Sequence, residues 1–266
     1  MARRLNRYAQ IIEAIFFRHY RPGDTEVGFE RKEINEVASE LGLRQIRNVG
    51  DAVYAFRFRA ELPDPIRATA PSGLEWVIRQ AGISQYRFVL TTFVNIVPTE
   101  GLVVTKILDA TPGMISSYAL DDEQALLAKL RYNRLIDIFT GITCYSLQSH
   151  LRTTVPDMGQ VEVDEIYIGV DSRGAHYVLP VQAKSGRDKL GVVQVEQDLA
   201  MCASKFPGMI CKPIAAHFMG EEVIALFEFE QSADGVGIVA EKHYKLVMVE
   251  EISPEEIARY AVRSPS

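Results

Sequence analysis

With 266 residues, of which 47% are hydrophobic and 24% charged, the chain can bury one large core or two smaller ones and is not disordered as a whole. No apolar run approaches the ~20 residues of a membrane-spanning helix, so we expect no membrane partner. The net charge of −6 disfavours nucleic acid, but residues 1–96 hold 14 Lys/Arg against 11 Asp/Glu, whereas residues 97–266 hold 15 against 24.

Residues 1–96 are predicted to form three helices and then a strand pair. Apolar residues recur at helical spacing over 4–19, and Pro22-Gly23 ends that helix. A second helix spans 30–41 and ends at Gly42. An arginine-rich segment over 43–59 is expected to be the third helix, and strands follow at 76–78 and 86–94.

Three helices and a hairpin predict a winged helix-turn-helix domain that binds double-stranded DNA. Its third helix would enter the major groove, where arginine and amide side chains contact base edges or phosphates. The candidate DNA-binding residues are Arg44, Gln45, Arg47, Asn48, Arg57 and Arg59. The alternative is a small helical domain that supports the core or a dimer interface, with Arg57 and Arg59 in ion pairs.

Residues 97–120 are predicted to be a connector around a strand at 102–108, and residues 121–266 a second domain. A helix at 121–141 precedes strands at 144–155, 161–171 and 176–184, and a helix at 188–206 precedes a strand at 209–219. Strands at 223–230 and 237–249 and a helix at 254–260 complete the chain. This order predicts an α/β domain with a mixed sheet flanked by helices.

Polar residues interrupt two of these strands where apolar ones are expected. Glu162 and Asp164 share one face of their strand, and Gln182 and Lys184 share a face of the next. If the strands pair around the turn at 172–174, Asp164 and Gln182 lie about equally far from its centre, so Asp164, Gln182 and Lys184 meet at one edge of the sheet. Burying such groups is costly unless they have a partner or a metal ion.

This set of side chains suits phosphodiester hydrolysis with Mg²⁺. A carboxylate such as Asp164 binds Mg²⁺, and the Gln182 side-chain oxygen and the Ala183 carbonyl can complete the coordination. Lys184 would position or deprotonate the attacking water and stabilise developing charge. Either Glu162 or Glu123, which begins the preceding helix, would provide a second acid.

Asp164, a spacer of 17 residues and then Gln182-Ala183-Lys184, in an αβββαβ order of elements, resembles the PD-(D/E)XK nuclease superfamily. Gln182 stands where Asp or Glu is usual, as in the QxK variants of that superfamily. A winged-helix domain ahead of a restriction-endonuclease-like core resembles bacterial restriction-type endonucleases. The resemblance implies a Mg²⁺-dependent DNA endonuclease that acts as a homodimer, at least transiently.

Several alternatives stay open. Asp157 is a second candidate for the motif aspartate, and Gln194 and Gln197 face either the site or solvent. Glu162, Asp164 and Lys184 would otherwise be surface ion pairs. The alternative functions are a repair or junction nuclease that uses the same site, and a winged-helix DNA-binding regulator whose nuclease-like core has lost activity. Three cysteines without a CxxC pair are typical of a cytoplasmic protein without a disulfide framework.

Overall fold

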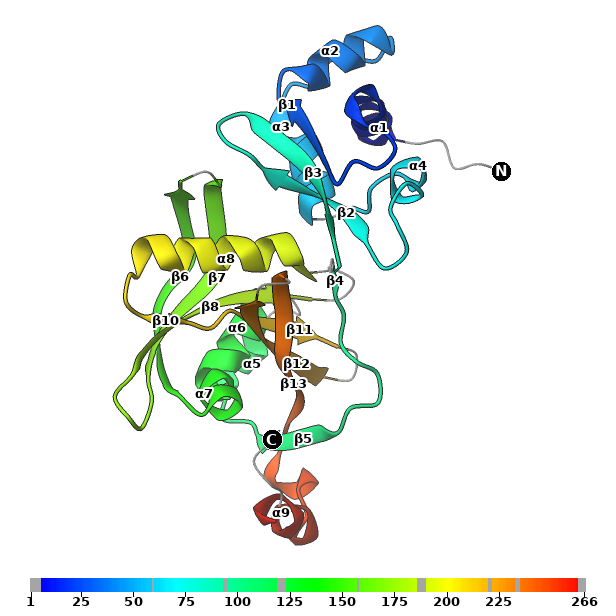
Figure 1. The fold of residues 1–266 in the computed structure, drawn as a ribbon. Helices are drawn as coiled ribbons and strands as arrows, with labels where there is room; N and C mark the ends of the chain where they lie inside the picture. The colour runs from blue at the N-terminus through cyan, green and yellow to red at the C-terminus, as the bar shows by residue number, and fades with distance from the viewer. Residues whose placement is uncertain are drawn as a thin grey trace.

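In the computed structural model, which describes residues 6–58, 60–92, 95–118, 123–156, 158–185, 190–219, 222–232 and 235–262, the chain forms an N-terminal unit and a larger core (Figure 1). The predicted α/β class is confirmed, with helices around a large mixed sheet. None of the helices in these ranges is long and apolar enough to cross a membrane.

The N-terminal unit combines helices with a small antiparallel sheet in the order β1-β3-β2. Its interior is apolar and aromatic, with Phe16, Ile34 and Phe88 fully buried. The Phe16 ring meets the Phe88 ring edge-on at a centroid distance of 5.0 Å. Its elements are α1 (Arg7–His19), β1 (Glu26–Glu30), α2 (Glu33–Glu40), α3 (Val49–Phe58), α4 (Asp64–Arg67), β2 (Glu75–Gln80) and β3 (Gln85–Thr91).

The prediction of a helix over 43–59 is wrong for its first six residues, because α3 begins only at Val49. Arg44, Gln45, Arg47 and Asn48 therefore lie in a loop. The cause is a contact distant in sequence: the Asn35 side chain accepts from the Ile46 N–H at 2.9 Å and donates to the Ile46 carbonyl at 3.4 Å. These bonds hold the segment against α2 in a non-helical course.

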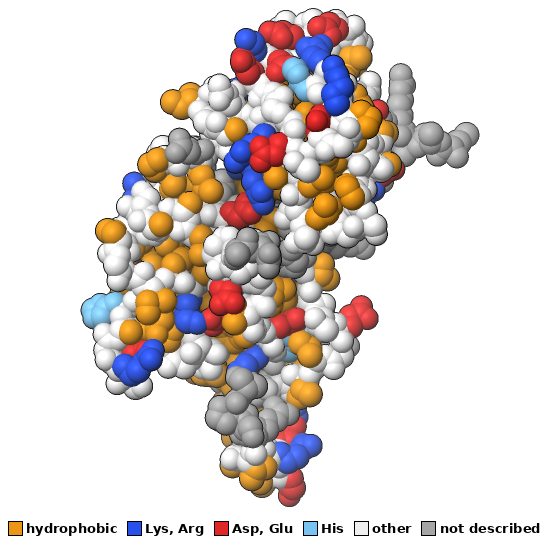
Figure 2. Space-filling view, viewed as in Figure 1, with side chains coloured by type: hydrophobic (Ala, Val, Ile, Leu, Met, Phe, Trp, Pro, Cys, Tyr) orange, Lys and Arg blue, Asp and Glu red, His pale blue; other side chains and the backbone are white. Residues whose placement is uncertain are grey.

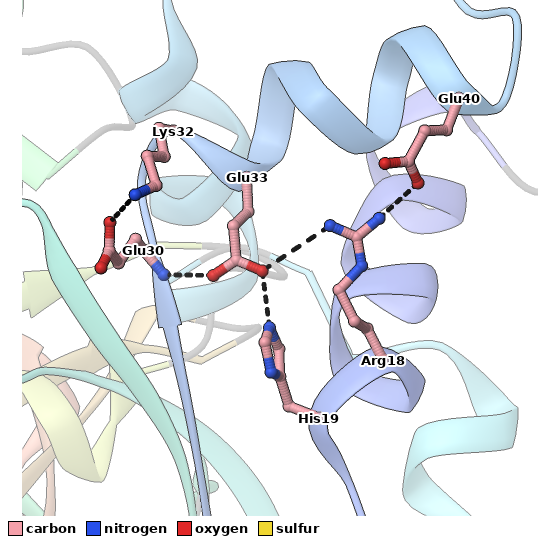
Figure 3. Close-up of polar contacts among 6 residues, drawn as sticks. All are labelled: Arg18, His19, Glu30, Lys32, Glu33 and Glu40. Carbon is pink, nitrogen blue, oxygen red and sulfur yellow. Dashed lines mark hydrogen bonds and ion pairs between the residues drawn. The ribbon is translucent and has the colours of Figure 1, made fainter.

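A charged cluster joins α1, β1 and α2 on the N-terminal unit (Figure 3). Its centre is Glu33, whose carboxylate accepts from the Glu30 N–H at 2.7 Å and contacts His19 Nε2 at 2.5 Å. Burial alone would raise the pKa of Glu33, but the hydrogen bonds from Glu30 and His19 and the charge of Arg18 outweigh burial and lower it. Arg18 also pairs with Glu40. We call this group the Glu33 cluster.

The core is built on an eight-stranded mixed sheet with the order β5-β13-β12-β11-β8-β7-β6, to which β10 adds beside β8. Strands β6, β7 and β8 form an antiparallel meander, and β11 pairs parallel to β8. The core elements are β4 (Asn95–Ile96), β5 (Val104–Leu108), α5 (Gly113–Tyr118), α6 (Glu123–Tyr132), α7 (Leu135–Thr140), β6 (Thr143–Val155), β7 (Gly159–Val170), β8 (His176–Lys184), β9 (Leu190–Gly191), α8 (Val192–Lys205), β10 (Ile210–Cys211), β11 (Ile214–Phe218), β12 (Val223–Ser232), β13 (Gly235–Val247), η2 (Val249–Glu251) and α9 (Pro254–Ala261).

Helices cover both faces of this sheet (Figure 1). Leu126, Leu130 and Ile136 of α6 and α7 pack on one face, whereas Val195 and Met201 of α8 pack in the clusters of the other. The single helix predicted over 121–141 is two helices, because the chain turns at Arg134, whose φ is 50°. The strand predicted inside the connector is β5, which pairs parallel to β13 at the edge of the sheet.

The N-terminal unit is attached to the core beside α8. Val77 of β2 is buried in the same apolar cluster as side chains of α8. Next to it, Arg79 forms a bidentate ion pair with Glu196 of α8, with Nε donating to Oε2 at 2.8 Å and Nη2 to Oε1 at 2.5 Å. A side chain at Gly159, the first residue of β7, would collide with the amide of the Gln80 side chain. The two units therefore meet over a packed and polar contact.

Candidate functional site

The hairpin of β7 and β8 has the predicted register. Its pairs run from Val170↔His176 to Glu165↔Val181, which are centred on Arg173 in the turn. Pairing ends at Glu165, so Asp164 and Gln182 lie just beyond the last pair. The side chains that the sequence grouped are thus brought together where the two strands separate.

Hydrogen bonds fix the orientation of the motif side chains. Asp164 Oδ2 accepts from the Ala183 N–H at 2.8 Å. Gln182 Nε2 donates to the Glu162 carbonyl at 3.2 Å and to Asp198 Oδ1 at 3.0 Å. Because both of these bonds use Nε2, the side-chain oxygen of Gln182 points away from them. The Asp164 carboxylate therefore accepts a hydrogen bond that a backbone carbonyl of the neighbouring strand would otherwise accept. This bond holds the carboxylate beside the Gln182-Ala183-Lys184 segment.

Glu123 is the acid that meets the motif lysine. It is the first residue of α6, and its Oε1 lies 3.3 Å from Lys184 Nζ. The Lys184 side chain is 15% exposed. Glu162 instead forms a surface pair with Arg152 across the β6–β7 hairpin at 3.0 Å. Of the two candidates for a second acid, the geometry favours Glu123. The prediction of surface ion pairs holds for Glu162 but not for Asp164, which bonds to backbone.

Asp198 is a functional candidate that sequence reasoning missed. It lies on α8, is 1% exposed and accepts from Gln182. Burial raises its pKa well above the usual range, against the hydrogen bond from Gln182, and the charge of Asp164 raises it further. The available signal was an acid on the inward face of an amphipathic helix, three residues from Val195 and three from Met201.

A divalent ion at this site would be coordinated partly by protein oxygens and partly by water. Within the ranges that the structure describes, no three Asp, Glu, His or Cys side chains gather closely enough to bind a metal ion. The oxygens on hand are those of Asp164 and Glu123, the Gln182 amide oxygen and the Ala183 carbonyl. Hard oxygen ligands in small number suit Mg²⁺, which keeps several waters, better than Zn²⁺ or a caged Ca²⁺.

The site opens into a cleft between the N-terminal unit and the core, with a volume of about 1620 Å³. We call it the inter-unit cleft. Residues of α3 and β2 line one side, and residues of β6, β7, β8 and α8 line the other. Five Arg or Lys and six Asp or Glu side chains line it, so the cleft is close to neutral. Charges of both signs are also mixed over the face shown in Figure 2.

The predicted DNA-binding residues are divided by this geometry. Asn48 and Arg57 line the inter-unit cleft, whereas Arg44, Gln45 and Arg47 are exposed on the loop before α3. Arg59 lies outside the described residues. The five described residues are therefore divided between the cleft lining and an exposed loop, because only part of the segment is helical.

The structure also places Gln194 and Gln197, which the sequence left between the site and solvent. Gln197 is 6% exposed and lines the cleft, so it is not on a solvated helix face. Gln194 also lines the cleft, and its Oε1 accepts from the Gly191 N–H at 3.3 Å at the start of α8. Asp157, the second candidate for the motif aspartate, lies outside the described residues.

A second polar network lies on β7 next to Asp164. Glu165 is fully buried, and its Oε1 accepts from Arg131 Nε at 3.0 Å and Nη2 at 2.8 Å and from Ser146. Arg131 belongs to α6, whose first residue is Glu123. This pair ties α6 to β7 and so helps to fix Glu123 relative to Asp164.

Comparisons of the chain with protein-family models, with curated proteins and with solved structures found no match.

Proposed function

We propose that this protein is a Mg²⁺-dependent endonuclease of restriction type that hydrolyses phosphodiester bonds in double-stranded DNA. The observation that carries the proposal is the convergence of Asp164, Gln182, Lys184 and Glu123 where β7 and β8 separate, facing a cleft shared with α3. A carboxylate pair and a partly buried ammonium beside a large cleft suit phosphoryl chemistry.

The topology of the core supports a PD-(D/E)XK assignment. Helices α6 and α7, strands β6 to β8, helix α8 and strand β11 follow the order αβββαβ, and β11 is parallel to β8. The motif residues lie on the second and third strands of this set. Fold alone carries no activity, so the weight rests on the side chains at the strand ends.

The order of elements also supports a winged-helix assignment for the N-terminal unit. A helix, a strand and three helices precede the β2–β3 hairpin, and β1 pairs with β3. Residues of α3 line the same cleft as Asp164. The N-terminal unit would therefore bind the stretch of DNA that the core cuts, and not a stretch of DNA far from the cleavage site.

The proposed roles follow from the contacts. Asp164 and Glu123, with the Ala183 carbonyl and the Gln182 oxygen, would hold Mg²⁺, which supplies polarisation of the phosphate and a water of lowered pKa. Lys184 orients the attacking water through its N–H groups and balances negative charge that develops on the phosphate. Gln197 faces the same cleft and can donate to substrate oxygens.

Cutting both strands of a duplex requires two such sites, so we propose that two copies act together at least transiently. The proposed location is the cytoplasm. Cys144, Cys202 and Cys211 are free thiols. A non-catalytic DNA-binding regulator is the second candidate. It is favoured by Gln182, an amide where the nuclease motif usually has an acid, and by the hydrogen bond from this amide to the buried Asp198.

The test is incubation of plasmid DNA with the protein, with and without Mg²⁺. Lys184→Ala should abolish cleavage and leave DNA affinity nearly intact, because Lys184 is one charge in a near-neutral cleft. Lys212→Ala is the matched control, since Lys212 also pairs with a glutamate, Glu228, but does not line the cleft. Discrete fragments support restriction, preference for branched substrates supports repair, and a mobility shift without cutting supports the regulator. Equal cutting by Lys184→Ala and wild type would overturn the proposed site.

A further inference from the structure

Arg57, on the cleft side of α3, is a half-buried cation. It lines the inter-unit cleft, and its Nε is shielded from solvent without a hydrogen-bond partner among the residues that the structure describes. Burial lowers the pKa of Arg57, and the groups that oppose this shift are the phenols of Tyr86 and Tyr54, not acids. A guanidinium with a shielded N–H that makes no hydrogen bond is costly to the fold.

The other cations of the cleft do not share this property. Arg67 pairs with Glu61 at 3.0 Å, Arg152 with Glu162 at 3.0 Å and Lys184 with Glu123 at 3.3 Å. Arg31 is exposed, so water can solvate its charge. Among the described cleft residues, Arg57 therefore stands out as the cation that combines partial burial with a shielded N–H that has no hydrogen-bond partner.

The surroundings of Arg57 favour a particular ligand. Its guanidinium lies over the Phe58 ring, with Cζ 4.8 Å from the ring centroid, which restrains the plane of the fork. The phenols of Tyr54 and Tyr86 are close enough to act on its charge, and a phenolic O–H can donate to an anion. A planar fork with hydroxyl donors beside it matches the oxygens of a phosphate group.

We propose that Arg57, with Tyr54 and Tyr86, is the binding site for one backbone phosphate of the DNA, on the wall of the cleft that faces Asp164 and Lys184. This inference rests on the proposed function, since it takes the cleft to be the DNA-binding cleft. Of the two roles expected for the arginines of this segment, the proposal assigns phosphate contact to Arg57 rather than base reading, and a phosphate contact carries no sequence preference. The site grips a phosphate other than the one that is cut.

The experiment compares DNA binding by wild type, Arg57→Met and Arg87→Met without Mg²⁺ over a range of salt. Methionine keeps an unbranched stem and removes the charge. We expect Arg57→Met to bind about 10- to 100-fold more weakly, as for the loss of hydrogen bonds to a charged group. The slope of log affinity against log salt should fall by about 0.9, the value for one phosphate. Arg87, an exposed arginine paired with Glu26, lies outside the cleft lining and should change neither.

Two further measurements separate binding from folding. Thermal unfolding of Arg57→Met should occur at or above the wild-type temperature, because the substitution removes a partly buried charge with an unpartnered N–H. A scan of duplexes with single methylphosphonate linkages should find one position that weakens binding by the wild type and leaves Arg57→Met unaffected. If wild type and Arg57→Met bind with equal affinity and salt slope, or if no linkage shows this dependence, the Arg57 site is wrong while the endonuclease proposal stands. If the wild type binds no DNA, both fail.

Discussion

The Glu33 cluster and the candidate site are both groups of charged side chains, but they are organised in opposite ways. In the Glu33 cluster the charges neutralise one another: Glu33 takes bonds from His19 and the Glu30 backbone, and Arg18 reaches Glu40 (Figure 3). In the candidate site Asp164 bonds to a backbone N–H, and Lys184 forms an ion pair with Glu123 in which Nζ and Oε1 are 3.3 Å apart.

The difference teaches how to separate structural from functional charge. A cluster that satisfies itself ties elements together and has little to offer a ligand. A cluster held by backbone bonds and facing a cleft keeps part of its hydrogen-bonding and ligating capacity for a substrate. Substitutions in the first should therefore change stability, and substitutions in the second should change activity.

The largest effect is expected from Asp164→Asn, which keeps the size of the side chain and removes its charge. Cleavage should fall by at least about three orders of magnitude at low Mg²⁺. The unfolding free energy should change little, because an amide oxygen can still accept from the Ala183 N–H. Single-turnover cleavage across a Mg²⁺ titration, together with urea unfolding, measures both. Normal cutting at low Mg²⁺ would move the metal site elsewhere and remove the contrast between the clusters.

Arg131→Met should have the next largest effect, on stability. It leaves Glu165 buried without its charged partner, which costs about 3–5 kcal/mol in comparable cases. The double substitution Arg131→Met with Glu165→Gln should recover much of this loss, because the buried charge is then gone. Urea unfolding of the two variants and the wild type gives the comparison. A single variant as stable as the wild type would show that Arg131 does not hold Glu165 in solution.

Glu33→Gln tests the self-satisfied cluster through pH. The folded pKa of Glu33 is lowered, so its charge stabilises the fold above about pH 4.5, its unfolded value, and this contribution is lost as the pH falls through the folded pKa. At pH 6 the variant should be less stable by about 1.5–3 kcal/mol, the range for hydrogen bonds to a charged group. The gap should close towards pH 3, with plasmid cleavage at neutral pH unchanged. A gap that stays constant with pH would mean that the carboxylate charge contributes nothing.

The smallest effect is expected from Arg47→Ala on the exposed loop before α3. If that loop touches DNA, affinity should fall modestly and the salt slope by about one unit, without a change in preference among sequences. A filter-binding titration at several salt concentrations measures this. Unchanged binding would confine DNA contact to the inter-unit cleft and sharpen the role of α3.

Local sequence patterns predicted the order of the core elements and the register of the β7–β8 hairpin. The turn at 172–174 and the alternation on either side of it determine the register, so the meeting of Asp164 with Gln182 and Lys184 was predictable. The order of core strands and helices followed from periodicity and from glycine and proline. The segment before α3 was not predictable, because Asn35 holds Ile46 through contacts eleven residues away.

What the sequence determined by itself is the α/β class, the order of the principal elements and the grouping of the motif side chains, since each depends on neighbours within a helix or a hairpin. Tertiary structure alone decided that Glu123 rather than Glu162 meets Lys184, that Asp198 accepts from Gln182 and that Arg57 lies half-buried in the cleft wall. These outcomes depend on how α6, α8 and α3 pack against the sheet and on each other. Such packing joins residues far apart in the chain, and no local pattern encodes the burial or the partner that results.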